Sequence, residues 1–268
     1  VNDHEINTVV AIFPDLYGRL MGKRFDAAYF LESTLDHGTH ACNYLLTVDM
    51  EMEPVGGYQF ANWDRGYGDF HLAPDLATLR SASWLPMTAV VICDVTSESS
   101  HALLPIAPRS LLKSQVEQLA EIGYAAQTAS ELEYYLFENS YQSLGREGFQ
   151  QLEPSSWYIE DYHMLQGSRD EVYNQRLRQA LTLSGIPVES SKGEWGRGQQ
   201  ELNIRHGEVL EIPLILLAGL GELSRIGELV LGQVVRHVPD GTGGPEADSC
   251  SAPSSSPPPA STSSSTSR

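Results

Sequence analysis

The feature that most limits what this chain can fold into is the point at which its large side chains stop. In a chain of 268 residues, the last aromatic residue is Trp195, the last lysine is Lys192 and the last methionine is Met164. Residues 240–268 are nearly all Ser, Pro, Gly, Thr and Ala, with no large apolar side chain. Ordering such a segment costs backbone entropy that no buried surface offsets. The core must therefore come from earlier residues, and 240–268 is predicted to be a disordered tail.

An aliphatic, Gly-rich segment at residues 211–239 separates the tail from the rest. Its longest uncharged run, Ile212–Gly221, is about half of the ~20 residues that a bilayer-spanning helix needs. Glu222, Arg225 and Glu228 follow at intervals of three residues, which suits the polar face of a helix. We predict a short packed helix here and no membrane span.

The charge and the cysteines of the chain restrict its partners and its compartment. Thirty-five acidic residues against 17 basic residues give a formal net charge of -18. So acidic a surface repels phosphate backbones and anionic lipids, which excludes nucleic acid and membranes as expected partners. The three cysteines, Cys42, Cys93 and Cys250, form no CxxC pair, and the first residues show no signal peptide. These features predict a cytoplasmic protein.

The pattern of residues 1–210 predicts an α+β fold. A strand is expected at 8–13, and a second strand should follow the Gly-bearing turn within 17–25. Further strands are expected at 45–52, 88–95 and 125–137, with a loop-rich stretch at 58–80. Leu112, Val116 and Leu119 recur at helical spacing, so 109–124 should be an amphipathic helix, and 171–185 a second one. Residues 186–205 follow as strand, Gly-rich loop and strand. We therefore expect a mostly-strand domain at 1–105 and alternating strands and helices at 106–210.

Two acidic residues share a face of the strand expected at 125–137. Glu131 and Glu133 are two residues apart, so both side chains should point to the same side of the sheet. Two such carboxylates repel each other unless a cation lies between them or one takes a proton. Oxygen ligands select hard ions such as Mg²⁺ or Mn²⁺. A solvated strand face is the alternative interpretation.

A second acidic pair brackets a glycine-rich loop. Glu194 and Glu201 flank the sequence WGRGQQ, in which Gly196 and Gly198 allow a tight turn and close approach of a ligand. A strand–loop–strand unit of this kind can direct both carboxylates into one cleft, although a charged hairpin tip has the same pattern. Glu189 lies five residues before Glu194, where a surface acid is the alternative to a ligand contact.

These acids and their neighbours resemble the first half of a glutamine synthetase, more closely a glutamine-synthetase-like γ-glutamyl ligase. No GxxxxGK[ST], GxSxG or HExxH motif points elsewhere. The matching segments occur in the family's order: DLYGRLMGKRF (15–25), GYGDFHLAPDLATLR (66–80), WLPMTAVVICDV (84–95), APRSLLKSQVEQLAEIGY (107–124), SELEYYLF (130–137) and GIPVESSKGEWGRGQQELNI (185–204).

The resemblance implies an N-terminal β-grasp domain at 1–105 and a truncated catalytic α/β domain at 106–210. It implies ATP as a substrate and two divalent metal ions, Mg²⁺ or Mn²⁺, in a homo-oligomeric ring with glutamate and ammonia or an amine as further substrates. Glu133, Glu194 and Glu201 would hold the metal that orients glutamate. Glu131 would hold the metal on the ATP phosphates, and Glu189 would contact the nucleotide.

The chain also departs from the family pattern. The family's later His ligand, last metal-binding Glu and phosphate-binding arginines have no counterpart, and the DGSS-type loop that helps to bind ammonium has none either. Asp64, in NWDRGYGD, is the nearest candidate for the ammonium-binding role. The expected function is ATP-dependent amide formation at the γ-carboxylate of glutamate. The alternatives are an inactive truncated or frameshifted chain, for which metal binding without turnover is expected, and a non-enzymatic module that docks into full-length rings.

Overall fold

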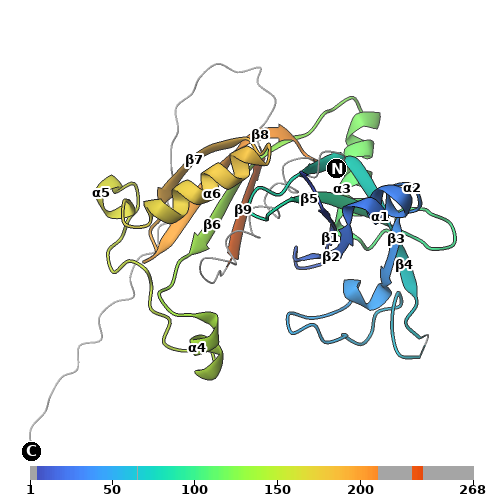
Figure 1. The fold of residues 1–268 in the computed structure, drawn as a ribbon, viewed down its shortest axis with the longest axis horizontal. Coiled ribbons are helices and arrows are strands. Elements are labelled where there is room, and N and C mark those ends of the chain that lie inside the picture. Colours follow the sequence, from blue (N-terminus) through green and yellow to red (C-terminus); the bar gives the residue numbers. More distant parts are fainter. Residues whose placement is uncertain (1–4, 65, 211–230, 238–268) are drawn as a thin grey trace, which may run out of the picture. The chain divides into compact units, whose positions relative to one another are not determined.

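The computed structural model describes residues 5–64, 66–210 and 231–237, and it contains two β-sheets with helices packed against them (Figure 1). This mixed arrangement agrees with the expected α+β class. The tail at 240–268 and residues 211–230 of the expected helical segment lie outside the described residues. None of the helices in the described part of the chain is long and apolar enough to cross a membrane.

The first sheet has five strands in the order β2-β1-β5-β4-β3. Its strands are β1 (Thr8–Pro14), β2 (Leu20–Asp26), β3 (Thr39–Cys42), β4 (Asp69–Ser81) and β5 (Thr88–Thr96). The central pair, β1 and β5, is parallel, and the other neighbours are antiparallel. A helical segment follows β2 and consists of α1 (Ala27–Tyr29), a π-helical turn (Phe30–Thr34) and α2 (Leu35–His37). The Asp26 carboxylate starts it by accepting hydrogen bonds from the backbone N–H groups of Ala28 and Tyr29.

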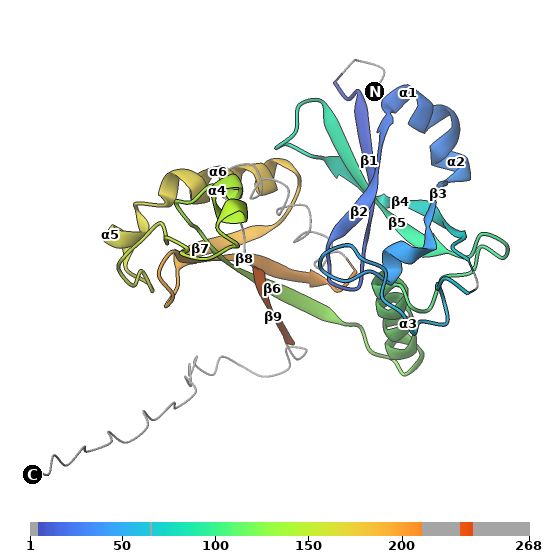
Figure 2. The same cartoon turned by 90° about the horizontal axis from the view of Figure 1, so that it is seen from below.

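Strands β1 and β5 are buried on both faces of the first sheet, because their alternate residues enter two different cores. Val9, Ala11 and Phe13 pack with Ala27 and Phe30 of the helical segment. On the opposite face, Ile12, Val90 and Ile92 join a core that also contains residues of the second sheet. Figure 2 shows α1 and α2 beside this sheet.

The second sheet has the order β7-β8-β6-β9, and all its neighbours are antiparallel. After α3 (Pro108–Glu121), the chain forms β6 (Gln127–Tyr135), α4 (Tyr141–Arg146), α5 (Met164–Gly167), α6 (Glu171–Leu183), β7 (Val188–Gly193), β8 (Gln199–Glu208) and β9 (Leu231–His237). The helices expected at 109–124 and 171–185 are confirmed as α3 and α6. The strand–loop–strand unit expected at 186–205 is confirmed as β7, its loop and β8.

Polar contacts join the two halves where β4 leads into β5. The Ser83 hydroxyl donates to the Ala180 carbonyl at 2.6 Å, and the Ser184 hydroxyl donates to Ser83 at 3.1 Å, near the end of α6. Helix α3 is held to the first sheet by Arg109, which forms ion pairs with Asp75 of β4 and Asp94 of β5. These bonds fix α3 and α6 against the first sheet.

Three expectations about local structure were wrong. Asn43–Leu46 is a 3₁₀ turn rather than the start of a strand at 45–52, because the Asp49 carboxylate then accepts from the backbone N–H groups of Glu51 and Glu53 and bends the chain. Residues 69–81, expected to be mostly loop, form β4, because pairing with β3 and β5 overrides a sequence poor in β-branched residues. Leu231–His237 is a strand and not a helix, since it pairs with the free edge of β6.

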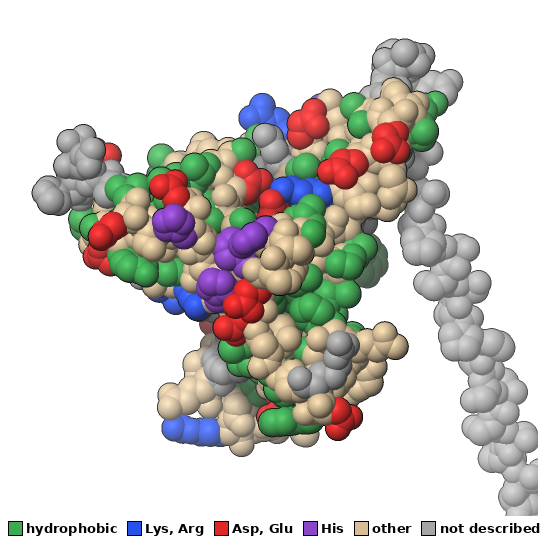
Figure 3. All heavy atoms as spheres, turned by 90° about the vertical axis from the view of Figure 1, so that its right-hand side faces the viewer, with side chains coloured by type: hydrophobic (Ala, Val, Ile, Leu, Met, Phe, Trp, Pro, Cys, Tyr) green, Lys and Arg blue, Asp and Glu red, His purple; other side chains and the backbone are tan. Residues whose placement is uncertain are grey.

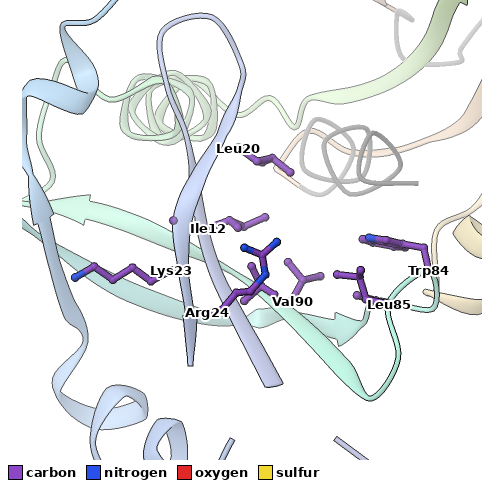
Figure 4. A pocket seen from close by; sticks show the side chains of 10 residues that line it. Ile12, Leu20, Lys23, Arg24, Trp84, Leu85 and Val90 are labelled. Carbon is purple, nitrogen blue, oxygen red and sulfur yellow. The ribbon is translucent and has the colours of Figure 1, made fainter. Parts of the chain in front are cut away.

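An apolar cavity of about 230 Å³ lies beside the first sheet. Figure 4 shows side chains of β1, β2, β5 and the β4–β5 connection around it: Ile12, Leu20, Arg24, Trp84, Leu85 and Val90. None of the six predicted site residues lines it. The predicted chemistry must therefore be sought on the second sheet.

Candidate functional site

The second sheet has one apolar face and one acidic face, as the alternation of its residues predicts. Leu132 and Tyr134 of β6 and Leu202 of β8 belong to the core that contains Leu177 and Leu181 of α6. The intervening residues point to the other side. In the register of the sheet, Glu133 pairs with Glu201, and Glu131 pairs with Asn203. Three of the four predicted metal ligands thus share one face.

The fourth ligand joins this face through the loop that follows β7. Glu194 comes directly after the strand, and its backbone N–H donates to the Gln199 carbonyl at 2.9 Å. Its carboxylate accepts from the backbone N–H of Trp195 at 3.1 Å. The loop is tight because a Cβ on Gly196 would lie 2.6 Å from the Tyr135 hydroxyl, and Gly198 has φ +70°. Both glycines therefore serve the tight turn that the sequence predicts.

Glu194 and Glu201 meet at the ammonium of Lys192. Lys192 is the cross-strand partner of Glu201, and its Nζ lies 3.1 Å from Glu201 Oε2 and also contacts Glu194 Oε1. Glu201 is only 5% exposed. Burial, and then the neighbouring Glu194 carboxylate, raise the pKa of Glu201. Burial opposes a fall in the pKa of Glu194, but hydrogen bonds from Glu201, Lys192 and the Trp195 backbone lower it. The two carboxyl groups therefore titrate as a linked pair, with the pKa of Glu201 shifted upward and that of Glu194 downward.

Amide side chains hold the other oxygens of this face in place. Gln199 Nε2 donates to Glu133 Oε2 at 2.7 Å, while Gln199 Oε1 accepts from the Tyr135 hydroxyl at 3.0 Å. Asn203 Nδ2 donates to Glu201 Oε1 at 2.7 Å. The result is a fixed set of carboxylate oxygens, the ligand chemistry that hard divalent cations prefer.

The four glutamates do not form a ready-made metal centre. In the part of the chain that the structure describes, no three acidic, His or Cys side chains are close enough together to hold an ion. Glu194 and Glu201 are brought together, whereas Glu133 and Glu131 lie two residues apart along β6. The donor set fits a divalent cation in chemistry, although its carboxylates are not gathered around one point.

The remaining predicted residues lie apart from this cluster. Glu189, exposed on β7, lines a cavity of about 510 Å³ together with Arg178, Ser191 and Lys192. Asp64 lies in an exposed turn of the segment before β4, which belongs to the first sheet and not to the acidic face. The roles predicted for both residues remain predictions.

A buried polar network behind the acidic face was not anticipated. Gln200 points away from the acids, and its Nε2 donates to Glu160 Oε2 at 2.6 Å. Asn174 Nδ2 donates to Gln200 Oε1 at 2.9 Å, and the Tyr134 hydroxyl donates to Asn174 Oδ1 at 2.6 Å. Glu160 is fully buried. This network anchors β8 from below, at the residue before Glu201.

Lys192 was also overlooked, although the sequence contained a signal for it. It lies two residues before Glu194, so strand alternation already predicts that both point to the same side. Glu160 had no such signal, because it lies in an irregular stretch before α5.

The histidines form a cluster of another kind. His71 is buried, and its ring contacts the rings of His40 and His101 at centroid distances of 5.4 and 5.0 Å. Both of its nitrogens are engaged, one with Thr96 Oγ1 at 3.0 Å and one with the His37 carbonyl at 2.8 Å. Figure 3 shows imidazoles gathered on one face of the molecule.

A sheet with an acidic face and a glycine-rich turn between two of its acids is an arrangement suited to a metal-dependent enzyme. Residues 105–212 match the family described as glutamine synthetase, catalytic domain. The γ-glutamylethanolamide synthetase of Streptomyces coelicolor is 44% identical over 206 residues, which are 77% of this chain and 44% of that protein. A glutamate–isopropylamine ligase of a Pseudomonas species is 32% identical over 211 residues, 79% of this chain and 46% of that protein.

The fold also has counterparts among solved structures. The solved structure of GmaS bound to ADP matches with a TM-score of 0.67 at 18% identity and covers 88% of this chain and 49% of that one. The chain thus spans about half the length of the relatives it matches. The family match over residues 105–212 and these relatives confirm the resemblance to the glutamine synthetase family.

Proposed function

We propose that the protein takes part in ATP-dependent formation of an amide at the γ-carboxylate of glutamate. The observation that carries this proposal is the acidic face of the family-matched sheet, where Glu201 stands opposite Glu133 and beside Glu194. A γ-carboxylate oxygen of glutamate attacks the γ-phosphorus of ATP, and ADP leaves. The amine nitrogen then attacks the carbonyl carbon of γ-glutamyl phosphate, phosphate leaves, and the amine loses a proton.

In this proposal the residues have separate tasks. Glu133, Glu194 and Glu201 hold the cation that orients glutamate, Glu131 holds a second one at the ATP phosphates, and Glu189 contacts the nucleotide. Divalent cations supply positive charge that brings carboxylate and triphosphate together in line. Gln199 and Asn203 keep the carboxylates of Glu133 and Glu201 in fixed orientations, so that less reorganisation is needed on binding.

We propose a small amine, rather than ammonia, as the acceptor. Two relatives support this choice, because one is named for ethanolamine and the other for isopropylamine. The absence from the sequence of the DGSS-type ammonium loop agrees with it, and Asp64 is the residue proposed to bind the amine. We also propose that the first sheet is a β-grasp domain, supported by its β1–β2 hairpin, the helical segment after it and the parallel central strands. A homo-oligomer is proposed from the family alone.

The test is a phosphate-release assay on the purified chain with ATP, glutamate and Mg²⁺, in which ethanolamine, isopropylamine and ammonia are compared. The proposal expects release that depends on both glutamate and amine, with a γ-glutamyl amide identified by mass spectrometry. Glu133→Gln should abolish it, while Glu98→Gln, the same change at an exposed turn, should not. Mn²⁺ binding without release would favour the inactive alternative. If the chain neither binds Mn²⁺ nor releases phosphate, the metal site itself is contradicted.

A further inference from the structure

The Lys192 ammonium occupies the space between two of the proposed metal ligands. Its Nζ contacts Glu194 Oε1 and lies 3.1 Å from Glu201 Oε2, while the ring of Tyr162 lies 4.6 Å away on another side. The Lys192 side chain is only 15% exposed. The position between these two carboxylates is thus already taken by a cation that belongs to the chain.

A bound divalent ion and this ammonium compete for the same carboxylate pair, because both are cations and repel each other at this distance. Carboxylate oxygens lie about 2.1 Å from Mg²⁺, closer than an ammonium approaches them. Lys192 holds Glu194 and Glu201 at hydrogen-bonding distances, which agrees with the finding that no three ligand side chains in the described residues surround one point. The lysine therefore keeps the pair together without forming the coordination shell.

We propose that Lys192 is a built-in counter-ion that occupies the Glu194–Glu201 pair in the metal-free protein and that a divalent cation displaces it. The inference rests on the proposed function, because it takes these two residues as metal ligands. Without the lysine, two carboxylates would face each other in a half-buried place, which destabilises the metal-free fold. With it, the arriving cation meets a positive charge that must first move away.

The geometry allows that movement. The lysine stem is flexible, and Lys192 is one of the residues that line the cavity beside Glu189 and Arg178. The Tyr162 ring can retain the ammonium near the site through a cation–π contact. Lys192 would thus stabilise the metal-free protein and lower the affinity of the site for metal.

The test makes two measurements on the full chain. Titration calorimetry gives the Mn²⁺ affinity, and thermal unfolding gives the melting temperature in EDTA and in Mn²⁺. Lys192→Met should melt earlier than wild type in EDTA, yet bind Mn²⁺ more tightly, by a factor on the order of tenfold, because a unit charge about 4 Å from a divalent ion is removed. Lys192→Arg keeps the charge and should bind no more tightly than wild type. Lys23→Met, on β2, makes the same change away from the acidic face and should leave Mn²⁺ affinity unchanged.

The outcomes separate this inference from the proposed function. Unchanged or weaker Mn²⁺ binding by Lys192→Met, with wild-type binding that Glu201→Gln reduces, would overturn the counter-ion role and leave the metal site standing. Wild-type protein that fails to bind Mn²⁺, or binds it regardless of Glu201→Gln, would overturn both. If Lys192→Met does not fold, Lys192→Gln, which retains a polar amide, decides the question by the same two measurements.

Discussion

Glu133 on β6 stands directly opposite Glu201 on β8 in the antiparallel register. Like charges in this position destabilise a sheet. The structure compensates with neighbouring donors: Gln199 binds Glu133, and both Asn203 and Lys192 bind Glu201. So many donors around two opposed acids indicate a site that tolerates an unfavourable charge arrangement instead of avoiding it.

Glu133→Gln should therefore weaken metal binding without weakening the fold. Removing one of two opposed charges relieves repulsion, so we expect the free energy of unfolding to stay within about 1 kcal/mol of wild type or to rise. Mn²⁺ affinity should fall at least tenfold. Urea denaturation and Mn²⁺ titration measure the two quantities, with Glu98→Gln as the control. A variant that unfolds more readily while binding Mn²⁺ normally would assign Glu133 to the fold alone.

Gly193→Ala should destabilise the protein through the polar network behind the site. A Cβ at this position would lie 2.5 Å from Glu160 Cβ and 2.8 Å from the Glu160 carbonyl oxygen. Neither atom is the end of a flexible side chain, so β7 or the buried Glu160 must shift. We expect a loss of about 1–3 kcal/mol in the free energy of unfolding, the usual cost of overpacking.

The matched control for that change is Gly145→Ala in α4, where an added Cβ would meet nothing within 4 Å. Because alanine favours helix, this variant should be neutral or more stable by up to about 1 kcal/mol. Urea denaturation of both variants checks the pair. Equal stability of Gly193→Ala and Gly145→Ala would mean that the close approach to Glu160 does not constrain the fold.

Periodicity was sufficient to predict the elements that carry the site. The alternation of Glu131 and Glu133 predicted their shared face, and the helical spacing of Leu112, Val116 and Leu119 predicted α3. These signals are local, since each depends on residues within one element. Strand β4 was missed because its stability comes from pairing with two distant strands, which no local pattern records.

The contacts of the acidic residues could not be predicted from a local pattern for the same reason. Glu160 comes into contact with Gln200 only through the packing of an irregular segment beneath β8. Lys192 could be assigned to a face from alternation, but its position between Glu194 and Glu201 depends on the β7–β8 register. The sequence thus predicts which side chains share a face, and the structure adds what each of them contacts.

The two cysteines in the described residues should differ sharply in reactivity. Cys42 is exposed, whereas Cys93 is buried on β5. Burial, reinforced by the Asp94 carboxylate, raises the pKa of Cys93 to about 12. Since the thiolate is the reactive form, iodoacetamide at pH 8 should alkylate Cys42 in the native protein and Cys93 only after denaturation. Peptide mass spectrometry measures each site separately, and rapid native labelling of Cys93 would contradict its burial.

Asp170, at the start of α6, should make the stability of the protein depend on pH. Burial raises the pKa of Asp170 above the ordinary value of 3.8, the Glu160 and Glu138 carboxylates add to this effect, and the Ser155 hydrogen bond opposes it. The folded protein therefore holds this proton at a pH where the unfolded chain has released it. By linkage, the contribution of Asp170 is fully present below pH 3.8 and is lost as pH rises through the raised value.

Asp170→Asn removes that dependence while keeping an oxygen that can accept from Ser155 Oγ, now 2.9 Å from the carboxylate, and from Gln200 Nε2 at 3.3 Å. We expect the variant to match wild type in melting temperature near pH 3.5 and to exceed it at pH 7, with the difference growing between these values. Asp36→Asn, at an exposed position on α2, should follow wild type throughout. Melting curves across this range measure the difference. A variant less stable than wild type at pH 7 would show that the charged form of Asp170 is favoured by its neighbours, and that burial does not govern its titration.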